Sequence, residues 1–341
     1  MTESIKNPSR EIPSGDIYCD TRLGGIKRWY YGKPKNANMR VDDNITKCVC
    51  FLSIKVKSKL AAGDDLFIGT AFIMHSSDDG MQPQFTYLVT AKHVIEDTKA
   101  EGHTNFYARF NTLAGGSEFL LLPDEWIYHD NPAVDVAVLA FNIDPTHFDY
   151  FALPSDLGIN EASISARGIG IGDLLLVTGL FNRRWGQGRN TPIARSGTIA
   201  AMPDPREPFV ADSGEMYNAY LAEVHSISGL SGSPVFVLTE TERPPQGKTG
   251  LTYYMTTLLL GMIRGHWDLE KQDAAHDAQR SKFDPNEVDR LNGGIAVVTP
   301  IQDVVEIING EPVRRKREQI KLETRKIKDL TLDSNLPNSH E

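Results

Sequence analysis

The sequence carries the stretch Ser228-Gly229-Leu230-Ser231-Gly232-Ser233-Pro234, and the apolar run Val235-Phe236-Val237-Leu238 follows at once. Glycine adopts backbone angles that other residues avoid, so Gly229 and Gly232 predict a tight turn that presents the hydroxyl of Ser231. The apolar run predicts a strand that anchors this turn. Clusters of Ser, Gly and Pro also form ordinary turns, so the role of Ser231 depends on its partners.

Two upstream residues are candidate partners of Ser231. His93 follows the apolar strand pattern of residues 87–91, and Asp135 interrupts the apolar run of residues 132–141. A carboxylate within an apolar strand is costly to bury unless it is hydrogen-bonded. Taken singly, each is more often a plain loop, edge or core residue. Their order favours a shared site, because 42 residues separate His93 from Asp135 and 96 separate Asp135 from Ser231.

Three blocks carry a resemblance to a known family. They are Thr90-Ala91-Lys92-His93, the run Val134-Asp135-Val136-Ala137-Val138-Leu139, and Gly229-Leu230-Ser231-Gly232-Ser233-Pro234. In order, spacing and local sequence they resemble the chymotrypsin/trypsin-like serine peptidase family, in its intracellular bacterial-type, disulfide-free form. The resemblance covers roughly residues 44–310.

The resemblance implies a serine endopeptidase that works through an acyl-enzyme. Ser231 would be the nucleophile, His93 the general base and then acid, and Asp135 the carboxylate that orients the imidazole. The backbone N–H groups of Gly229 and Ser231 would form the oxyanion hole. No cofactor and no metal is implied, and the substrate would be a protein or peptide.

Two positions depart from the family pattern. Leu230 stands where secreted members have an aspartate that pairs with a newly cleaved N-terminus, so that activation switch cannot operate here. Ser233 replaces a glycine, as in many bacterial and viral relatives, and predicts no loss of activity.

The pattern of apolar runs and turns predicts an all-β fold of two six-stranded antiparallel barrels with a short C-terminal helix. We expect an N-terminal extension (1–43), a first barrel with His93 and Asp135 (44–150), a second barrel with Ser231 (151–310) and a charged C-terminal tail (311–341). The first set of strands is Cys48–Val56, Leu66–Met74, Phe85–Ala91, Asn105–Phe110, Phe119–Leu122 and Val134–Phe141. The second set is Asp173–Leu180, Ile193–Ala201, Ala219–Val224, Ser233–Leu238, Leu251–Ile263 and Gly294–Thr299.

A helix is predicted after the last strand. Thr299 is a suitable N-cap, Pro300 fits the first helical position, and Gln302 completes a capping-box pattern. Ile301, Val304, Val305 and Ile308 form one apolar stripe, and Gly310 ends the helix.

The substrate pocket is predicted from residues just before Ser231 and from the strand Gly261–Gly265. His225 falls near the base of the family's pocket, and Arg264 and Gly265 are its further candidates. His225 or Arg264 would favour an acidic or polar side chain. The charged insertion 268–292 and the basic segment 314–328 are candidate contact surfaces for a partner or regulator, although a basic segment is also typical of a solvated helix or frayed tail.

Composition narrows the classes of function and compartment. The chain of 341 residues, 40% of them hydrophobic, is long enough for a large core. A net charge of −9 argues against a general nucleic-acid binder, and no apolar run reaches the ~20 residues of a membrane span. Cys19, Cys48 and Cys50 are an odd set, and no second Cys/His pair completes a metal site. With no signal-peptide pattern at the N-terminus, we expect buried free thiols and a cytoplasmic protein.

Two other functions remain open at this point. An inactive protease-like scaffold would act as a protein-binding module and would not need all three reactive residues. A hydrolase of esters or other acyl groups would use the same machinery as a peptidase.

Overall fold

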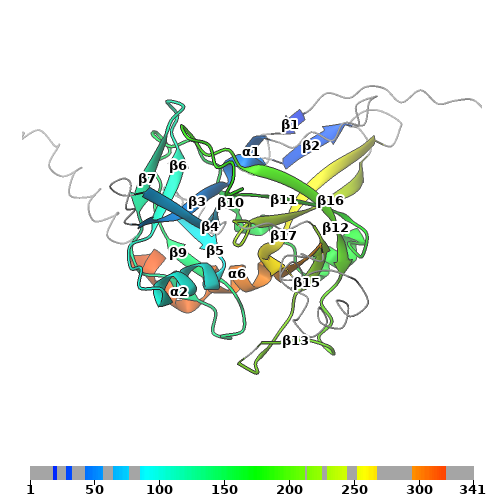
Figure 1. The fold of residues 1–341 in the computed structure, drawn as a ribbon. Helices are drawn as coiled ribbons and strands as arrows, with labels where there is room; N and C mark the ends of the chain where they lie inside the picture. The colour runs from blue at the N-terminus through cyan, green and yellow to red at the C-terminus, as the bar shows by residue number, and fades with distance from the viewer. Residues whose placement is uncertain are drawn as a thin grey trace, which may run out of the picture.

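A computed structural model describes residues 18–20, 28–32, 43–56, 64–76, 85–211, 213–224, 229–243, 252–266 and 294–319. The described part is mostly β: two large antiparallel sheets lie together, with short helices around them (Figure 1).

The first sheet is built from the N-terminal half. Its strand order is β7-β6-β3-β4-β5-β9-β8, and β10 pairs with β4 in parallel. The strands are β3 (Val49–Val56), β4 (Asp64–His75), β5 (Thr86–Thr90), β6 (Tyr107–Asn111), β7 (Ser117–Leu121), β8 (Ile127–Tyr128), β9 (Ala137–Ala140) and β10 (Leu153–Pro154). Within the described residues β7 does not pair with β8, so the first of the two predicted barrels is observed as an open sheet.

The second sheet closes into a barrel. Its order β17-β16-β11-β12-β15-β18 is completed by pairing of β18 with β17. These strands are β11 (Leu174–Gly179), β12 (Ile193–Ala201), β15 (Tyr220–Glu223), β16 (Pro234–Arg243), β17 (Thr252–His266) and β18 (Ile295–Pro300). A closed six-stranded barrel therefore forms where the sequence predicts one. The strands β11, β16, β17 and β18 are rich in β-branched, aromatic and other apolar residues, which favour strands.

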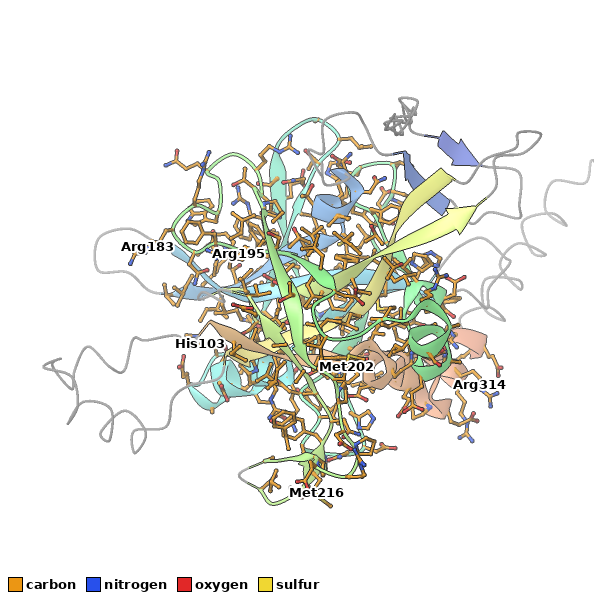
Figure 2. All side chains as sticks on the ribbon, turned by 90° about the vertical axis from the view of Figure 1, so that its right-hand side faces the viewer. His103, Arg183, Arg195, Met202, Met216 and Arg314 are labelled. Carbon is orange, nitrogen blue, oxygen red and sulfur yellow. The ribbon has the colours of Figure 1, made fainter. Side chains whose placement is uncertain are left out.

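Two hairpins lie outside the barrel itself. The strands β1 (Tyr18–Asp20) and β2 (Arg28–Gly32) extend the barrel sheet through pairing of β2 with β17. The strands β13 (Phe209–Val210) and β14 (Met216–Tyr217) pair with each other and project from the body. Figure 2 shows Met216 on this projection, where its side chain is largely exposed.

The helices lie at the ends of the strands. They are α1 (Asp43–Lys47), α2 (Lys92–Ala100), α3 (Glu161–Arg167) and α6 (Ile301–Asn309), and Ser155–Leu157 form a turn of 3₁₀ helix. The helix predicted after the last strand is α6, which ends at Gly310, and its residues Ile301, Val304 and Ile308 are buried as expected.

The predicted start of α6 is wrong. Thr299 belongs to β18, and the N-cap is Pro300, with no side-chain capping bond. The amide of Gln302 donates instead to the carbonyl of Ile159 at 2.6 Å. Thr299 thus continues the barrel strand instead of capping the helix. The Gln302 side chain binds a distant residue, Ile159, instead of the helix start.

The two sheets share one apolar core. A single cluster of buried side chains includes Leu52 and Val89 of the first sheet and Val177, Phe236 and Met262 of the barrel. Cys48 and Cys50 are buried free thiols, which confirms that prediction. Burial raises the pKa of both thiols, so they stay protonated.

A buried arginine fastens the long β11–β12 loop to the first sheet. The Arg109 guanidinium on β6 donates to Ser117 Oγ at 2.8 Å and to the carbonyls of Gly186 and Gln187 at 2.7 and 2.8 Å. Its face also lies 5.0 Å from the ring centre of Trp185. This contact joins the two halves of the chain at a distance from the turn of Ser231.

The start of the basic segment is described and partly packed. Residues 311–319 are helical, and the buried Arg317 donates to Ile308 O at 2.7 Å and to Tyr87 Oη at 3.1 Å. The rest of 314–328 and the whole insertion 268–292 lie outside the described residues. No described helix combines the length and the apolar character needed to cross a membrane.

Candidate active site

His93 and Asp135 form a two-point pair. The imidazole Nδ1 lies 2.7 Å from Asp135 Oδ2, and the backbone N–H of His93 donates to Oδ1 at 2.9 Å. The Asp135 side chain is buried, and the His93 side chain is 39% exposed. Since a carboxylate only accepts, the pair fixes Nδ1 as the protonated nitrogen and leaves Nε2 as a free base.

Local helix structure explains why both carboxylate oxygens are used. His93 lies in the first turn of α2, where backbone N–H groups have no partner within the helix. The N-cap is Ala91, which has no side-chain acceptor. Asp135 takes that role from a different segment, so the capping bond and the imidazole bond orient one carboxylate.

Charge pairing sets the ionisation of this pair. Burial lowers the pKa of His93, but the hydrogen bond and charge of Asp135 outweigh it and hold this pKa above its usual value. Burial likewise raises the pKa of Asp135, but hydrogen bonds from His93 hold it below its usual value. Asp135 is therefore an anion at neutral pH, and it stabilises the imidazolium form of His93.

The turn of Ser231 is a tight turn, as predicted. Gly229 and Gly232 have φ of 98° and 83°, the region that favours glycine. A Cβ at Gly232 would lie 2.1 Å from Thr70 O and 2.4 Å from Thr90 Oγ1. Glycine at this position thus lets the turn press against the backbone of the first sheet.

Main-chain bonds hold this turn on β4. The N–H of Thr70 donates to Ser231 O at 3.0 Å, and Thr70 Oγ1 donates to Gly229 O at 2.7 Å. The two acceptors, Ser231 O and Gly229 O, belong to the same two residues whose N–H groups are the predicted oxyanion donors. Among the described backbone pairs, the N–H groups of Gly229 and Ser231 have no acceptor.

The turn and the His93 helix meet beside β4 and the end of β5, two central strands of the first sheet. The Cβ position of Gly232 lies 3.2 Å from Ala91 N, two residues before His93, and that of Gly69 lies between Val94 and Ser231 O. Ser231 is half-buried. Within the described chain, no hydrogen bond joins its hydroxyl to the His93 ring; such bonds commonly tighten only when substrate is present.

The two departures from the family pattern are both buried. Leu230 is fully buried, and its carbonyl accepts from Ser233 N at 2.9 Å. The Ser233 hydroxyl is also buried, 2.0 Å from where a Cβ at Gly179 would be. Gly179 thus provides the space for Ser233, at a position that also lies 2.9 Å from Thr70 Oγ1 of the first sheet.

A cavity of about 500 Å³ opens beside His93 and Asp135. Arg264 and Gly265 line it, whereas His225 lies outside the described residues. The other lining residues are Lys92, Glu96, Asp97, Pro132, Ala133, Tyr217 and Val297. Tyr217 was not predicted, because it comes from the short projecting hairpin and no sequence pattern links it to His93.

The cavity holds both signs of charge, and no described cluster of three His, Cys, Asp or Glu side chains could bind a metal ion. His93 and Asp135 line this cavity as a base held by a carboxylate, whereas Ser231 is not among its lining residues.

Comparisons with known proteins give little further information. No protein-family model matches the chain, and no curated protein matches it significantly. Among solved structures, the chain is similar to a crystal structure of Deg5, with a TM-score of 0.37 and 14% sequence identity over 63% of this chain and 85% of that chain. A similarity of this size decides nothing about function, so the assignment rests on the contacts described above.

Proposed function

We propose that this chain is a serine endopeptidase with the triad His93–Asp135–Ser231. Ser231 Oγ attacks a peptide carbonyl while His93 Nε2 takes the hydroxyl proton, which forms a tetrahedral intermediate. His93 then returns that proton to the leaving amine, and the acyl-enzyme remains on Ser231. Water, activated by His93 in the same way, attacks the ester and frees both the acid and Ser231.

The pairing of His93 with Asp135 carries the proposal. The buried Asp135 carboxylate lies 2.7 Å from Nδ1 and accepts from the backbone N–H of His93 at 2.9 Å. These two contacts leave Nε2 unprotonated and fix the orientation of the imidazole ring. A structural ion pair would need neither the fixed tautomer nor a ring that remains 39% exposed. The turn of Ser231 lies against the residues just before this ring.

The oxyanion hole in this proposal is formed by the N–H groups of Gly229 and Ser231. Support comes from the two bonds that hold the turn through its carbonyls, at Thr70 N and Thr70 Oγ1. Removal of one such donor typically lowers rates by about 10²–10³-fold. Because the donors belong to the backbone, Leu230 between them does not disturb their chemistry.

Covalent labelling tests the nucleophile. The purified chain is treated with a fluorophosphonate probe, and the modified peptide is identified by mass spectrometry. We expect label on Ser231 that is lost in Ser231→Ala and His93→Ala. Ser233→Ala is the matched control, because this neighbouring hydroxyl is buried and should keep the label.

Each outcome of the labelling decides the proposal. Label that persists in Ser231→Ala would move the nucleophile elsewhere. A folded wild-type chain that stays unlabelled, with and without cell extract, would overturn the enzyme and leave the binding scaffold. If label is found, matched peptide and ester substrates with the same acyl group separate a peptidase from an esterase.

We place this activity in a reducing compartment, the cytoplasm. The support is that Cys48 and Cys50 are buried, unpaired and kept as thiols by a raised pKa. Cell fractionation with mass spectrometry of each fraction tests this placement, and recovery of the chain outside the cytoplasmic fraction would overturn it.

A further inference from the structure

Arg264 occupies a bulge in a barrel strand that faces the candidate site. In the pairing of β17 with β18, Ile263 faces Val298 and Gly265 faces Val297, so Arg264 is the extra residue. A bulge turns the side chain of its extra residue away from the regular alternation of the strand. Here it turns Arg264 across to the first half of the chain.

The Arg264 side chain contacts three separate segments. Nη1 donates to the carbonyl of Ala133 at 3.0 Å, two residues before the candidate orienting carboxylate. Nε lies 3.9 Å from Asp135 Oδ2. The guanidinium also lies over the ring of Tyr217, 4.1 Å from its centre, on the β14 strand. The barrel, the projecting hairpin and the Asp135 segment therefore meet at one cation.

Arg264 faces the same carboxylate oxygen of Asp135 that contacts the His93 ring. Asp135 Oδ2 is also the acceptor for His93 Nδ1, at 2.7 Å. A planar guanidinium that binds a backbone carbonyl and stacks on an aromatic ring has few alternative orientations, so its charge is held in place. With Asp135 buried and Arg264 only 26% exposed, water screens this contact weakly.

We propose that Arg264 is a positioning residue that fixes Asp135 against His93 and partly neutralises its charge. The effect on rate depends on the proposed peptidase function, but the effect on His93 itself does not. The negative charge of Asp135 makes the His93 imidazole more basic, and the positive charge of Arg264 opposes this effect. Arg264 thus favours the neutral form of His93, which is the form that acts as a base, near neutral pH.

Among the described residues that line the cavity, the charged groups other than Asp135 and Arg264 are on the helix of His93. Lys92, Glu96 and Asp97 of α2 line the same cavity, together with Asp135 and Arg264. The charge of Asp97 raises the pKa of His93, and that of Arg264 lowers it. Lys92 is engaged with Pro132 O at 2.9 Å. Loss of Arg264 thus leaves His93 facing a mainly acidic surrounding.

A histidine titration followed by NMR measures this effect without the need for catalysis. His93 signals are identified as those that are lost in His93→Ala, and the pKa is compared in wild type, Arg264→Lys and Arg264→Gln. We expect the His93 pKa to rise in Arg264→Gln, which keeps a donor for Ala133 but loses the charge. We expect it to stay near the wild-type value in Arg264→Lys. Arg183→Gln is the matched control, since Arg183 is exposed.

Labelling rates of Ser231 then separate charge from positioning. In Arg264→Gln the pH profile should move to higher pH. In Arg264→Lys the pH profile should keep its midpoint, while the maximal labelling rate falls about tenfold. The reason is that lysine lacks the planar guanidinium that binds Ala133 O and stacks on the Tyr217 ring. An unchanged His93 pKa in Arg264→Gln would overturn the proposal. A wild-type chain that does not label would overturn the peptidase and leave the titration as the test of Arg264.

Discussion

Replacement of Asp135 by asparagine should inactivate the site, although the two side chains have the same shape and size. The backbone N–H of His93 donates to Oδ1 at 2.9 Å, so that atom must remain an oxygen in Asp135→Asn. The amide NH₂ then faces Nδ1, at the 2.7 Å position of Oδ2. The NH₂ group is a donor and requires Nδ1 to accept, which moves the imidazole proton to Nε2. The base that should take the Ser231 proton is then blocked.

The size of the effect follows from the tautomer and from the lost charge. An Asp-to-Asn change in a triad of this kind lowers kcat by about 10⁴-fold, which corresponds to roughly 5.5 kcal/mol of transition-state stabilisation. The Asp135 charge also raises the His93 pKa. The midpoint of the pH profile should therefore move to lower pH in Asp135→Asn, while the plateau falls.

The assay is the second-order rate of fluorophosphonate labelling at Ser231 as a function of pH. Wild type and Asp135→Asn are compared at equal folded fraction, which circular dichroism and the thermal midpoint establish. A plateau within tenfold of wild type would refute the tautomer argument. A large loss with an unchanged midpoint would show that Asp135 does not set the ionisation of His93.

Two further predictions concern stability. Gly232→Ala should lower the free energy of unfolding by at least about 1–3 kcal/mol from its positive φ, and further because the new Cβ would lie 2.1 Å from a backbone oxygen. Gly170→Ala, which meets nothing within 4 Å, is its control in urea unfolding, and equal midpoints would contradict the packing argument. Asp303, in the first turn of α6, has its pKa raised to about 6, mainly by burial. The folded chain thus binds this proton more tightly than the unfolded chain, so stability falls as pH rises from about 4 to about 6 and the cost persists above that. Asp303→Asn should therefore raise the thermal midpoint more at about pH 7.5 than at about pH 4.5; an equal gain at both would mean that ionisation is not the cause.

The strands could be predicted because each carries its own signal. The β5 segment Thr86–Thr90 is buried along its whole length, and the β12 bounds Ile193–Ala201 coincide with the predicted ones. The three short helices α1, α2 and α3 were not predicted. The Asn160 cap of α3 pairs with Ser163 instead of Glu or Gln, which is a weaker pattern. In α2 the capping acceptor is 42 residues away, in Asp135.

The open form of the first sheet and the role of Arg264 could not be predicted, and the physical reason is the same for both. Both depend on which strand ends meet, and a local pattern contains no information on such long-range pairing. The place of Arg264 in the strand Gly261–Gly265 predicted only that it lies near the substrate pocket. The bulge that redirects it arises only when β17 pairs with β18. Its contact with Ala133 spans 131 residues.

Long-range pairing also joins the two halves of the chain at the candidate site, through the buried Thr70 of β4. Thr70 Oγ1 accepts from Leu180 N at 2.9 Å and donates to Gly229 O at 2.7 Å, while its backbone N–H holds Ser231 O. Its own carbonyl accepts from Thr90 Oγ1 at 2.7 Å, next to the strand end from which the His93 helix starts. Every polar group of Thr70 is thus hydrogen-bonded to another segment, two of them to the turn of Ser231, and none can move without loss of a hydrogen bond. The position of Ser231 relative to the His93 helix is therefore set mainly by strand β4 and only secondarily by the glycine turn.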